Sequence, residues 1–180
     1  MIEISRIQPD FRHWDDLLAL ILSSFSYMDE IIDPPSSALR LTLASLAAKA
    51  SSEIAFVAME NGRLAGCVFC KPEPNFLYIG KLAIAPAFQG KGLGRRLLAT
   101  TEEVARERQL PALRLETRIE LVGNHATFSR WGFERTAENA HPGFSRTTSI
   151  EMQKNSPEGI NRGPATRGWA ADDRRKRRGY

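Results

Sequence analysis

The stretch FLYIGKLAIAPAFQGKGLGRR, residues 76–96, decides how the rest of the chain is interpreted. Its first half is a mostly apolar run with β-branched residues, which is typical of a buried strand. Pro86 has no backbone N–H to donate to a neighbouring strand, so we expect the strand to end there. Gly90, Gly92 and Gly94 follow, and then leucines at helical spacing. The pattern predicts a strand, a glycine-rich turn and the start of a helix.

This turn is suited to holding an anion at the helix N-terminus. Without Cβ atoms the backbone can adopt positive φ angles and approach a ligand closely. Successive N–H groups can then point to one anion, and the helix dipole favours negative charge there. Lys91, Arg95 and Arg96 add positive charge around the same point. We therefore expect a pyrophosphate group to bind at this turn.

The spacing of the glycines excludes the two commonest phosphate-binding loops. A P-loop needs GxxxxGK followed by Ser or Thr, whereas Lys91 is followed by Gly92. A dinucleotide-binding loop needs GxGxxG, and Arg95 occupies the position of the third glycine. The sequence instead has Gln-x-x-Gly-x-Gly at residues 89–94, after a strand that ends in Leu-Ala-Ile-Ala-Pro. This pattern resembles the coenzyme A signature of the GNAT superfamily of N-acetyltransferases; a purely structural tight turn is the alternative.

Composition indicates a single soluble domain of ordinary size. The chain has 180 residues, of which 42% are hydrophobic and 26% are charged, as in globular proteins. The longest apolar run, residues 17–22, is far shorter than a membrane span. The first ten residues lack the pattern of a signal peptide. We expect a cytoplasmic protein with no membrane partner.

The positive charge is concentrated at the end of the chain. Residues 155–180 hold seven Lys or Arg and three Asp or Glu, whereas residues 1–154 hold 18 of each sign. The last segment cannot build a core, so we predict a domain at residues 1–154 and a basic, disordered tail at 155–180. The run RRKRR at residues 174–178 could contact nucleic acid or an acidic partner; a solvated tail is the simpler hypothesis.

Cys67 and Cys70 form a lone C-x-x-C pair in a predicted strand. Positions three apart on a strand face opposite sides, which opposes metal ligation by both thiols, and no second cysteine pair exists. We expect two small, buried, reduced thiols and no metal site.

The first half of the chain reads as a strand, two helices and three antiparallel strands. Apolar spacing predicts a strand at residues 2–7, a helix from an Asp10 cap to about Tyr27, and a second helix that opens at Ser36 or Ser37. Two strands joined by the turn Asn61-Gly62 then form a hairpin, and the strand at residues 76–85 follows.

The second half continues with alternating helices and strands. After the helix that begins near residue 93 we predict a strand at residues 112–117 and a short helix capped by Asn124 and closed by Gly132. Last strands are predicted at residues 133–136 and 147–152. The whole order is mixed α/β.

This order is that of the GNAT fold, and the resemblance covers about residues 2–153. A second motif supports it: Asn124, followed by a helix that ends in Trp-Gly-Phe-Glu at residues 131–134, resembles the family's second cofactor-binding segment. The resemblance implies a mainly antiparallel sheet, flanked by helices and splayed between its fourth and fifth strands. It also implies an N-acetyltransferase in which an amine attacks acetyl-CoA directly. The acceptor would be a small-molecule or peptide amine; the oligomeric state stays open, and a homodimer is one option.

The resemblance assigns the cofactor to one strand end and one loop. Backbone groups of the strand would pair with the pantetheine arm and polarise the thioester carbonyl, while its side chains could simply pack in the core. Main-chain N–H groups of the glycine loop would hold the pyrophosphate, with cationic side chains adding charge. Asn124 would be either a cofactor contact or a helix cap. The predicted cofactor-binding residues are Leu82, Ala83, Ile84, Gln89, Gly90, Lys91, Gly92, Leu93, Gly94, Arg95 and Asn124.

Direct attack needs an acid for the departing thiolate. Many members of the family carry a tyrosine five residues before the Phe of the Gly-Phe pair, whereas this chain has Phe128. Water, Ser129 or Tyr78 could supply the proton, and a thiol of ordinary pKa needs little help. The missing phenol also leaves a second hypothesis open, a non-catalytic acyl-CoA-binding sensor or regulatory module.

Direct attack also needs a base for the ammonium proton. Glu116, at the end of its predicted strand, is the candidate, and a surface ion pair with Arg114 or Arg118 is the alternative role. Glu120 and His125 are further candidates for the base. Aromatic and apolar side chains ahead of the second helix are candidates for an acceptor cleft; these are Phe25, Tyr27 and Met28.

Overall fold

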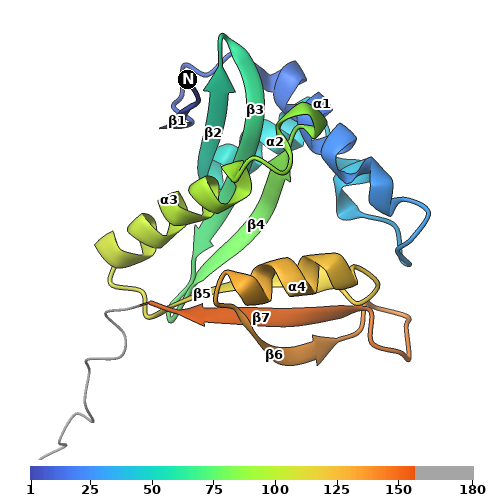
Figure 1. Ribbon diagram of the computed structural model, residues 1–180. Helices are drawn as coiled ribbons and strands as arrows, with labels where there is room; N and C mark the ends of the chain where they lie inside the picture. Colours follow the sequence, from blue (N-terminus) through green and yellow to red (C-terminus); the bar gives the residue numbers. More distant parts are fainter. Residues whose placement is uncertain (157–180) are drawn as a thin grey trace, which may run out of the picture.

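A computed structural model describes residues 1–156; the RRKRR run and the rest of the predicted tail from residue 157 lie outside the described residues. Seven strands form one sheet, in the order β1-β2-β3-β4-β5-β7-β6 (Figure 1). All neighbouring strands are antiparallel except β4 and β5. The elements are β1 Glu3–Arg6, α1 Trp14–Phe25, η1 Ser26–Met28, η2 Ser37–Arg40, α2 Leu43–Ser52, β2 Ile54–Glu60, β3 Arg63–Pro72, β4 Leu77–Ile84, η3 Pro86–Phe88, α3 Leu93–Glu107, β5 Ala112–Arg118, α4 Val122–Arg130, β6 Glu134–Asn139 and β7 Ser149–Asn155.

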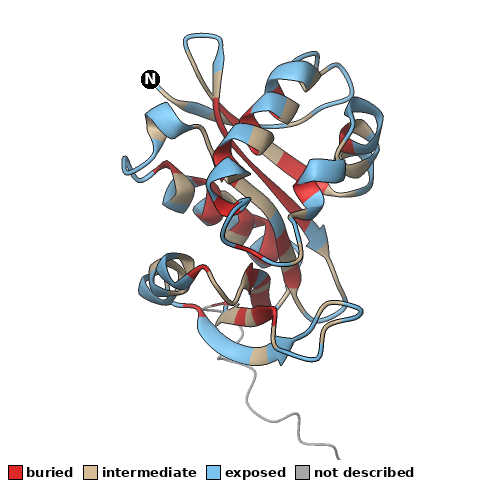
Figure 2. Cartoon of the chain, turned by 90° about the vertical axis from the view of Figure 1, so that its right-hand side faces the viewer, coloured by how far each residue is buried: buried red, intermediate tan, exposed pale blue. Residues whose placement is uncertain are grey.

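Helices cover both faces of the sheet and produce two separate cores. The buried leucines of α1 and α2 pack with one set of strand side chains, and those of α3 pack with the other set. Figure 2 shows the buried residues along the strands and on the helix faces that cover them. Cys67 belongs to the first core and Cys70 to the second, and both are buried and free. The predicted opposite orientation of the two thiols is therefore confirmed.

The sheet opens between β4 and β5, as the resemblance to the GNAT fold implied. The two strands pair only from Leu77 with Leu113 to Ile79 with Leu115, although both continue beyond this point. Figure 1 shows β2–β4 and β5–β7 diverging from there. In β4 the register against β3 slips by one residue just after Ile79, and such a bulge bends a strand and increases its twist. The bulge therefore coincides with the start of the splay.

The hairpin, the helix that follows the glycine loop and the closing of the last helix at Gly132 are all confirmed. Asn61 and Gly62 have φ angles of 50° and 74°, as a tight two-residue turn requires, and β3 pairs with β2 across it. Gly132 has a φ of 94° and ends α4, where the N–H of Phe133 donates to the Phe128 carbonyl at 3.0 Å. The strand before the loop ends at Ile84, two residues ahead of Pro86.

The predicted start of the first helix is wrong, and the second helix starts as predicted but does not continue without a break. Asp10 does not cap α1, which begins at Trp14 after an edge-on contact of its ring with Phe11 at 4.8 Å. The second helix is divided: η2 is capped by the Ser36 side chain, and α2 begins anew after Thr42. The Thr42 and Ser45 side chains cap each other's backbone N–H groups reciprocally, which fixes that new start.

The remaining helix start and the end of the domain also differ from the prediction. Asn124 lies inside the first turn of α4 instead of capping it, and its N–H donates to the Leu121 carbonyl at 2.9 Å. At the other end, β7 runs to Asn155, and the N–H of Ser156 donates to the Pro111 carbonyl at 2.8 Å. Residues 155 and 156 therefore pack with the domain, although the prediction assigned them to the tail.

Candidate active site

A cavity of about 650 Å³ lies between the end of β4, the glycine loop and α4. All of the predicted cofactor-binding residues except Lys91 line it. The Lys91 Nζ instead donates to the Ala87 carbonyl at 3.0 Å and lies 5.6 Å from the centre of the Phe88 ring. Side chains that the sequence analysis did not assign to the cofactor complete the lining: Ser24, Phe25, Tyr27, Met28, Phe88, Thr127, Phe128 and Trp131.

The glycine loop presents bare backbone to this cavity. Gly92 has a φ of 78° and immediately precedes α3, and an added Cβ atom there would meet nothing within 4 Å. The N–H groups in the first turn of a helix have no partner inside the helix. Gly94 is the second residue of α3. A Cβ atom added there would lie 3.2 Å from the Trp131 ring, so the glycine allows α3 to approach the end of α4 closely. The loop therefore offers unpaired donors beside open space.

The end of β4 turns part of its backbone toward the splay. The N–H of Ala85 donates to Ala65 in β3 at 2.9 Å, and backbone groups of alternate residues face opposite neighbours. Leu82 and Ile84 therefore direct their backbone groups to the β5 side, where pairing has already ended. The Ile84 carbonyl accepts from the Ser24 hydroxyl at 2.9 Å and from the Gln89 side-chain amide at 3.1 Å. The N–H of Leu82 faces the gap.

A second cavity of about 540 Å³ adjoins the first on the β5 side. Glu116 and Tyr78 line it together with residues 34–37, which end the η1–η2 connection and begin η2. The two cavities share the following lining residues: Phe25, Met28, Leu82, Asn124 and Phe128. They therefore meet where Leu82 faces the splay, and a molecule in one can touch a molecule in the other.

Glu116 is exposed in this second cavity and accepts a hydrogen bond from the Asn139 side-chain amide at 3.4 Å. Within residues 1–156 no cation lies within 4 Å of its carboxylate. Arg114 instead pairs with Glu151 at 3.5 Å, and Arg118 donates to the Pro35 carbonyl at 3.1 Å. The ion pair of Glu116 with Arg114 or Arg118, which was the alternative role, is therefore not formed.

Of the other side chains considered for proton transfer, one lines a cavity and three do not. Tyr78 lines the second cavity, and burial, followed by the charge of Glu116, raises the pKa of its phenol to about 12, so the phenol keeps its proton. Ser129 is exposed and lines neither cavity. A ring nitrogen of His125 lies 2.8 Å from the Arg118 carbonyl, and Glu120 pairs with Arg146 at 3.6 Å; neither of these two lines a cavity.

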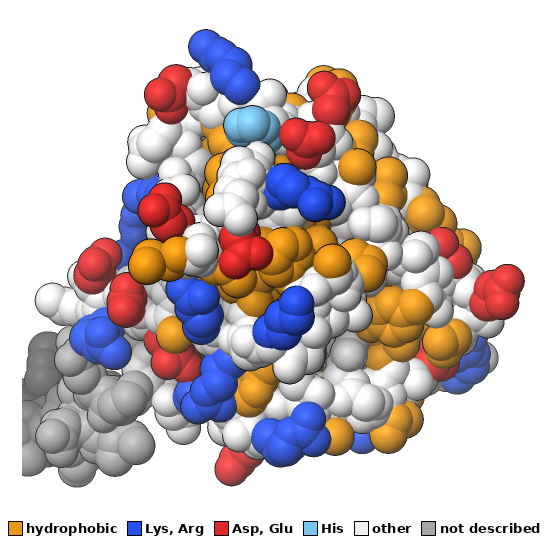
Figure 3. Space-filling model, turned by 45° about the horizontal axis from the view of Figure 1, so that its top comes forward, with side chains coloured by type: hydrophobic (Ala, Val, Ile, Leu, Met, Phe, Trp, Pro, Cys, Tyr) orange, Lys and Arg blue, Asp and Glu red, His pale blue; other side chains and the backbone are white. Residues whose placement is uncertain are grey.

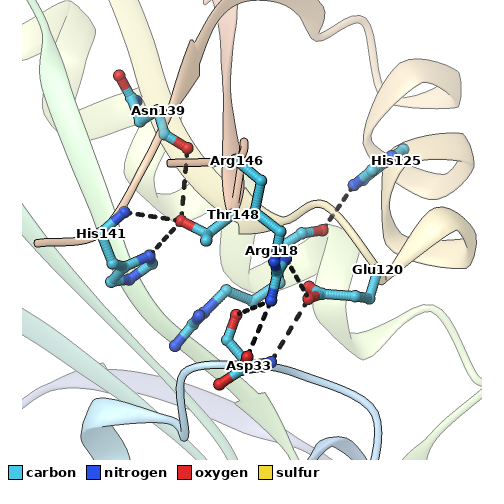
Figure 4. Close-up of polar contacts among 8 residues, drawn as sticks. All are labelled: Asp33, Arg118, Glu120, His125, Asn139, His141, Arg146 and Thr148. Carbon is cyan, nitrogen blue, oxygen red and sulfur yellow. Dashed lines mark hydrogen bonds and ion pairs between the residues drawn. The ribbon is translucent and has the colours of Figure 1, made fainter. Parts of the chain in front are cut away.

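An ion cluster fastens the segment over the second cavity to the far end of the sheet. Arg146, in the loop between β6 and β7, pairs with Asp33 at 2.9 Å and with Glu120 at 3.6 Å (Figure 4). The N–H of Asp33 also donates to the Glu120 carboxylate at 3.4 Å. Three loops far apart in sequence are held together here. These contacts hold Asp33, and with it the adjacent residues 34–37 that form one wall of the second cavity.

Within residues 1–156, no group of three or more His, Cys, Asp or Glu side chains is arranged to hold a metal ion. Among the same residues no helix has both the length and the apolar character needed to cross a bilayer.

Comparisons with known proteins agree with this arrangement. The profile of the acetyltransferase (GNAT) family matches residues 14–133. The N-alpha-acetyltransferase 30 of Schizosaccharomyces pombe is 31% identical over 88 residues, which are 46% of this chain and 59% of that protein. The chain thus matches somewhat more than half of this relative's length.

Solved structures share the fold at low identity. The PaiA N-acetyltransferase from Thermoplasma acidophilum, in complex with coenzyme A, has a TM-score of 0.70 at 15% identity and covers 86% of this chain and 99% of its own. A GNAT family acetyltransferase from Elizabethkingia anophelis with acetyl-CoA bound has a TM-score of 0.61 at 21% identity and covers 86% and 97%. The family match and the shared fold confirm the resemblance read from the two motifs. The chain belongs to the acetyltransferase (GNAT) family, whose members transfer acetyl groups from acetyl-CoA.

Proposed function

We propose that the protein transfers the acetyl group of acetyl-CoA to a primary amine of a small molecule or a peptide. The observation that carries this proposal is the meeting of two cavities at Leu82, one lined by the glycine loop and the other by Glu116. Membership of the acetyltransferase (GNAT) family supports acetyl-CoA as the donor. The two cavities then correspond to the donor site and the acceptor site.

The donor set of the first cavity fits a pyrophosphate. Unpaired N–H groups in the first turn of α3 and the positive end of its dipole favour an anion, and the Arg95 side chain adds charge at the rim. The gap between β4 and β5 suits an extended arm that pairs with strand backbone, and the Leu82 N–H would then donate to the thioester carbonyl oxygen. Bound acetyl-CoA supplies the thioester, while the protein supplies position and hydrogen bonds.

The reaction balances with one base on the protein. The amine nitrogen attacks the thioester carbonyl carbon, a C–N bond forms, and the C–S bond breaks with its electron pair leaving on sulfur. Glu116 accepts the proton that the amine loses, because its carboxylate lies in the acceptor cavity and, among residues 1–156, forms no ion pair within 4 Å. Phe128 lines both cavities and has no proton to donate, so water protonates the thiolate; the raised pKa of Tyr78 makes its phenol a weaker acid than the thiol.

The test is thiol release from acetyl-CoA with a panel of primary amines. We expect turnover with at least one amine, and a loss of about 10²- to 10⁴-fold in kcat for Glu116→Gln, with unchanged affinity for coenzyme A. Glu134→Gln is the matched control, since Glu134 is exposed on β6 and lines neither cavity. Coenzyme A binding without turnover of any amine would contradict the proposal and favour the non-catalytic acyl-CoA-binding module.

A further inference from the structure

The proposed acceptor cavity has a strongly uneven charge. Four cationic side chains line it, and Glu116 is the only carboxylate among its lining residues. The cations come from four elements: Arg40 from η2, Lys49 from α2, Lys81 from β4 and Arg118 from β5. An excess of cations assembled in this way favours an anionic ligand.

Within residues 1–156, only one of the four cations has a carboxylate within 4 Å. Lys49 pairs with Glu53 at 2.7 Å. The Lys81 Nζ donates to the Ser37 hydroxyl at 3.0 Å, and among residues 1–156 no carboxylate lies within 4 Å of it. Burial, followed by the nearby charge of Lys49, lowers the pKa of Lys81, as expected for a cation that lacks a counter-ion. A bound anion would reverse that penalty.

Arg118 also retains unused hydrogen-bonding capacity. One of its terminal nitrogens donates to the Pro35 carbonyl, whereas the other, Nη1, is buried without a hydrogen-bond partner in the structure. Arg146 pairs with Asp33 and with one oxygen of Glu120 (Figure 4), and the second oxygen of Glu120 is likewise buried without a hydrogen-bond partner. A buried guanidinium N–H without a partner is unfavourable, and a carboxylate oxygen is the strongest partner it can take.

This concentration of cations is local. Residues 1–154 hold equal numbers of cationic and acidic side chains. On the face shown in Figure 3, which includes the α1 end of the molecule, side chains of both signs are interspersed with apolar ones. The basic lining is thus a property of the cavity, and a general surface excess of the domain does not explain it.

We propose that the acceptor is a primary amine that also carries a carboxylate, with the amine near Glu116 and Leu82 and the carboxylate near Lys81, Arg118 and Arg40. This inference rests on the proposed function. The volume of about 540 Å³ is that of a small-molecule site. Nearby cations also disfavour the ammonium form of the acceptor, which increases the fraction of neutral amine that can attack.

The experiment compares acceptors that differ only in charge: glycine and glycinamide, aspartate and asparagine, glutamate and glutamine. We expect kcat/KM to be about 10- to 100-fold higher for the acid than for the amide of the preferred pair. Peptides with an acidic residue behind a free N-terminus form a separate arm. Turnover of those peptides alone would place the carboxylate on a peptide side chain; turnover of the free amino acids would place it on a small molecule.

Two variants test the cations directly. Arg40→Gln and Lys81→Gln should each reduce the ratio of acid to amide, mainly through KM of the acid, whereas Arg63→Gln in the distant hairpin should leave the ratio unchanged. Calorimetry with the same acids and amides on the protein saturated with coenzyme A measures the preference even without turnover. Failure of all turnover would contradict the proposed function alone. Equal binding of acid and amide, or a ratio unaffected by both variants, would overturn the inference on the acceptor.

Discussion

Replacing Gly92 by alanine separates two effects of the glycine loop. Gly92 has a φ of 78°, and a residue with a Cβ in this region costs about 1–2 kcal/mol. A Cβ there would meet nothing within 4 Å, so the φ angle is the whole cost in the protein without ligand. For a domain of this size the melting temperature should fall by roughly 2–8 °C.

Binding of coenzyme A should lose more than this change in stability suggests. The added methyl group would occupy the open space in which the pyrophosphate is proposed to lie, and would weaken one or two charge-assisted hydrogen bonds from the backbone. That loss corresponds to a dissociation constant about 10- to 100-fold higher. Calorimetric titration with coenzyme A measures it, and a thermal melt of the same sample measures stability.

Gly62→Ala is the matched control. Gly62 has a φ of 74° and equally open surroundings, but it lies in the β2–β3 turn and lines neither cavity. Both variants should therefore lose similar stability, while only Gly92→Ala should lose affinity for coenzyme A. Equal affinities in the two variants would refute the assignment of the pyrophosphate to the loop.

Three further predictions concern packing, burial and the loop cluster. Gly66→Ala should destabilise the fold by about 1–3 kcal/mol in urea unfolding, because its Cβ would lie 3.0 Å from a backbone oxygen of β4; an unchanged midpoint would contradict this packing. Burial raises the pKa values of Cys67 and Cys70 from 9.0 to about 12, so thiol reagents should label them only in denaturant, and rapid labelling of the native protein would be inconsistent with the fold. For the same reason the folded state holds these protons more tightly than the unfolded chain, and stability should fall as the pH rises from 9 toward 12. Arg146→Gln should cost less than about 1 kcal/mol, since its ion pair with Asp33 is exposed, yet it should raise KM for the amine without changing coenzyme A affinity; a parallel loss of both would show a general structural defect.

The strand and glycine-loop part of the first cavity was predictable from the sequence because its residues are nearly consecutive, whereas its α1 and α4 sides come from distant segments. The loop at residues 89–95 and the preceding strand carry local signals, namely Pro86, the spaced glycines and the apolar strand pattern. The hairpin turn at Asn61-Gly62 was predictable for the same reason. In each case backbone geometry depends on residues a few positions apart, so short-range patterns are sufficient.

The second cavity, which we propose as the acceptor site, was not predictable in this way. Its lining joins residues 34–37, the end of β5 and the β6–β7 connection, which tertiary packing alone brings together. Of the side chains that the sequence analysis named for an acceptor site, Glu116, Phe25 and Met28 line the second cavity, whereas Tyr27 lines only the first. The sequence gave no signal that Lys81 and Arg118 would converge beside Glu116. The apolar β4 pattern even obscured Lys81, whose side chain reaches the cavity next to the bulge.

The predicted helix caps at Asp10 and Asn124 were wrong for a related physical reason. Asp10 and Asn124 are residue types that commonly cap helices, but a cap forms only where the preceding chain direction allows it. The helix α1 begins at Trp14, whose ring contacts Phe11, and therefore starts after the position that an Asp10 cap would give. The helix α4 begins at Val122, two residues before Asn124. Residue type alone therefore misplaced both starts by a few positions.

The central claim is that backbone N–H groups of the glycine loop bind the pyrophosphate of coenzyme A. A titration of ¹⁵N-labelled protein with coenzyme A, followed by amide chemical shifts, tests it most directly. The largest shifts should come from residues 90–95, with smaller ones at Leu82 and along the α4 face that carries Asn124. Saturable shifts centred on another part of the chain, or no shifts at millimolar coenzyme A, would contradict the claim.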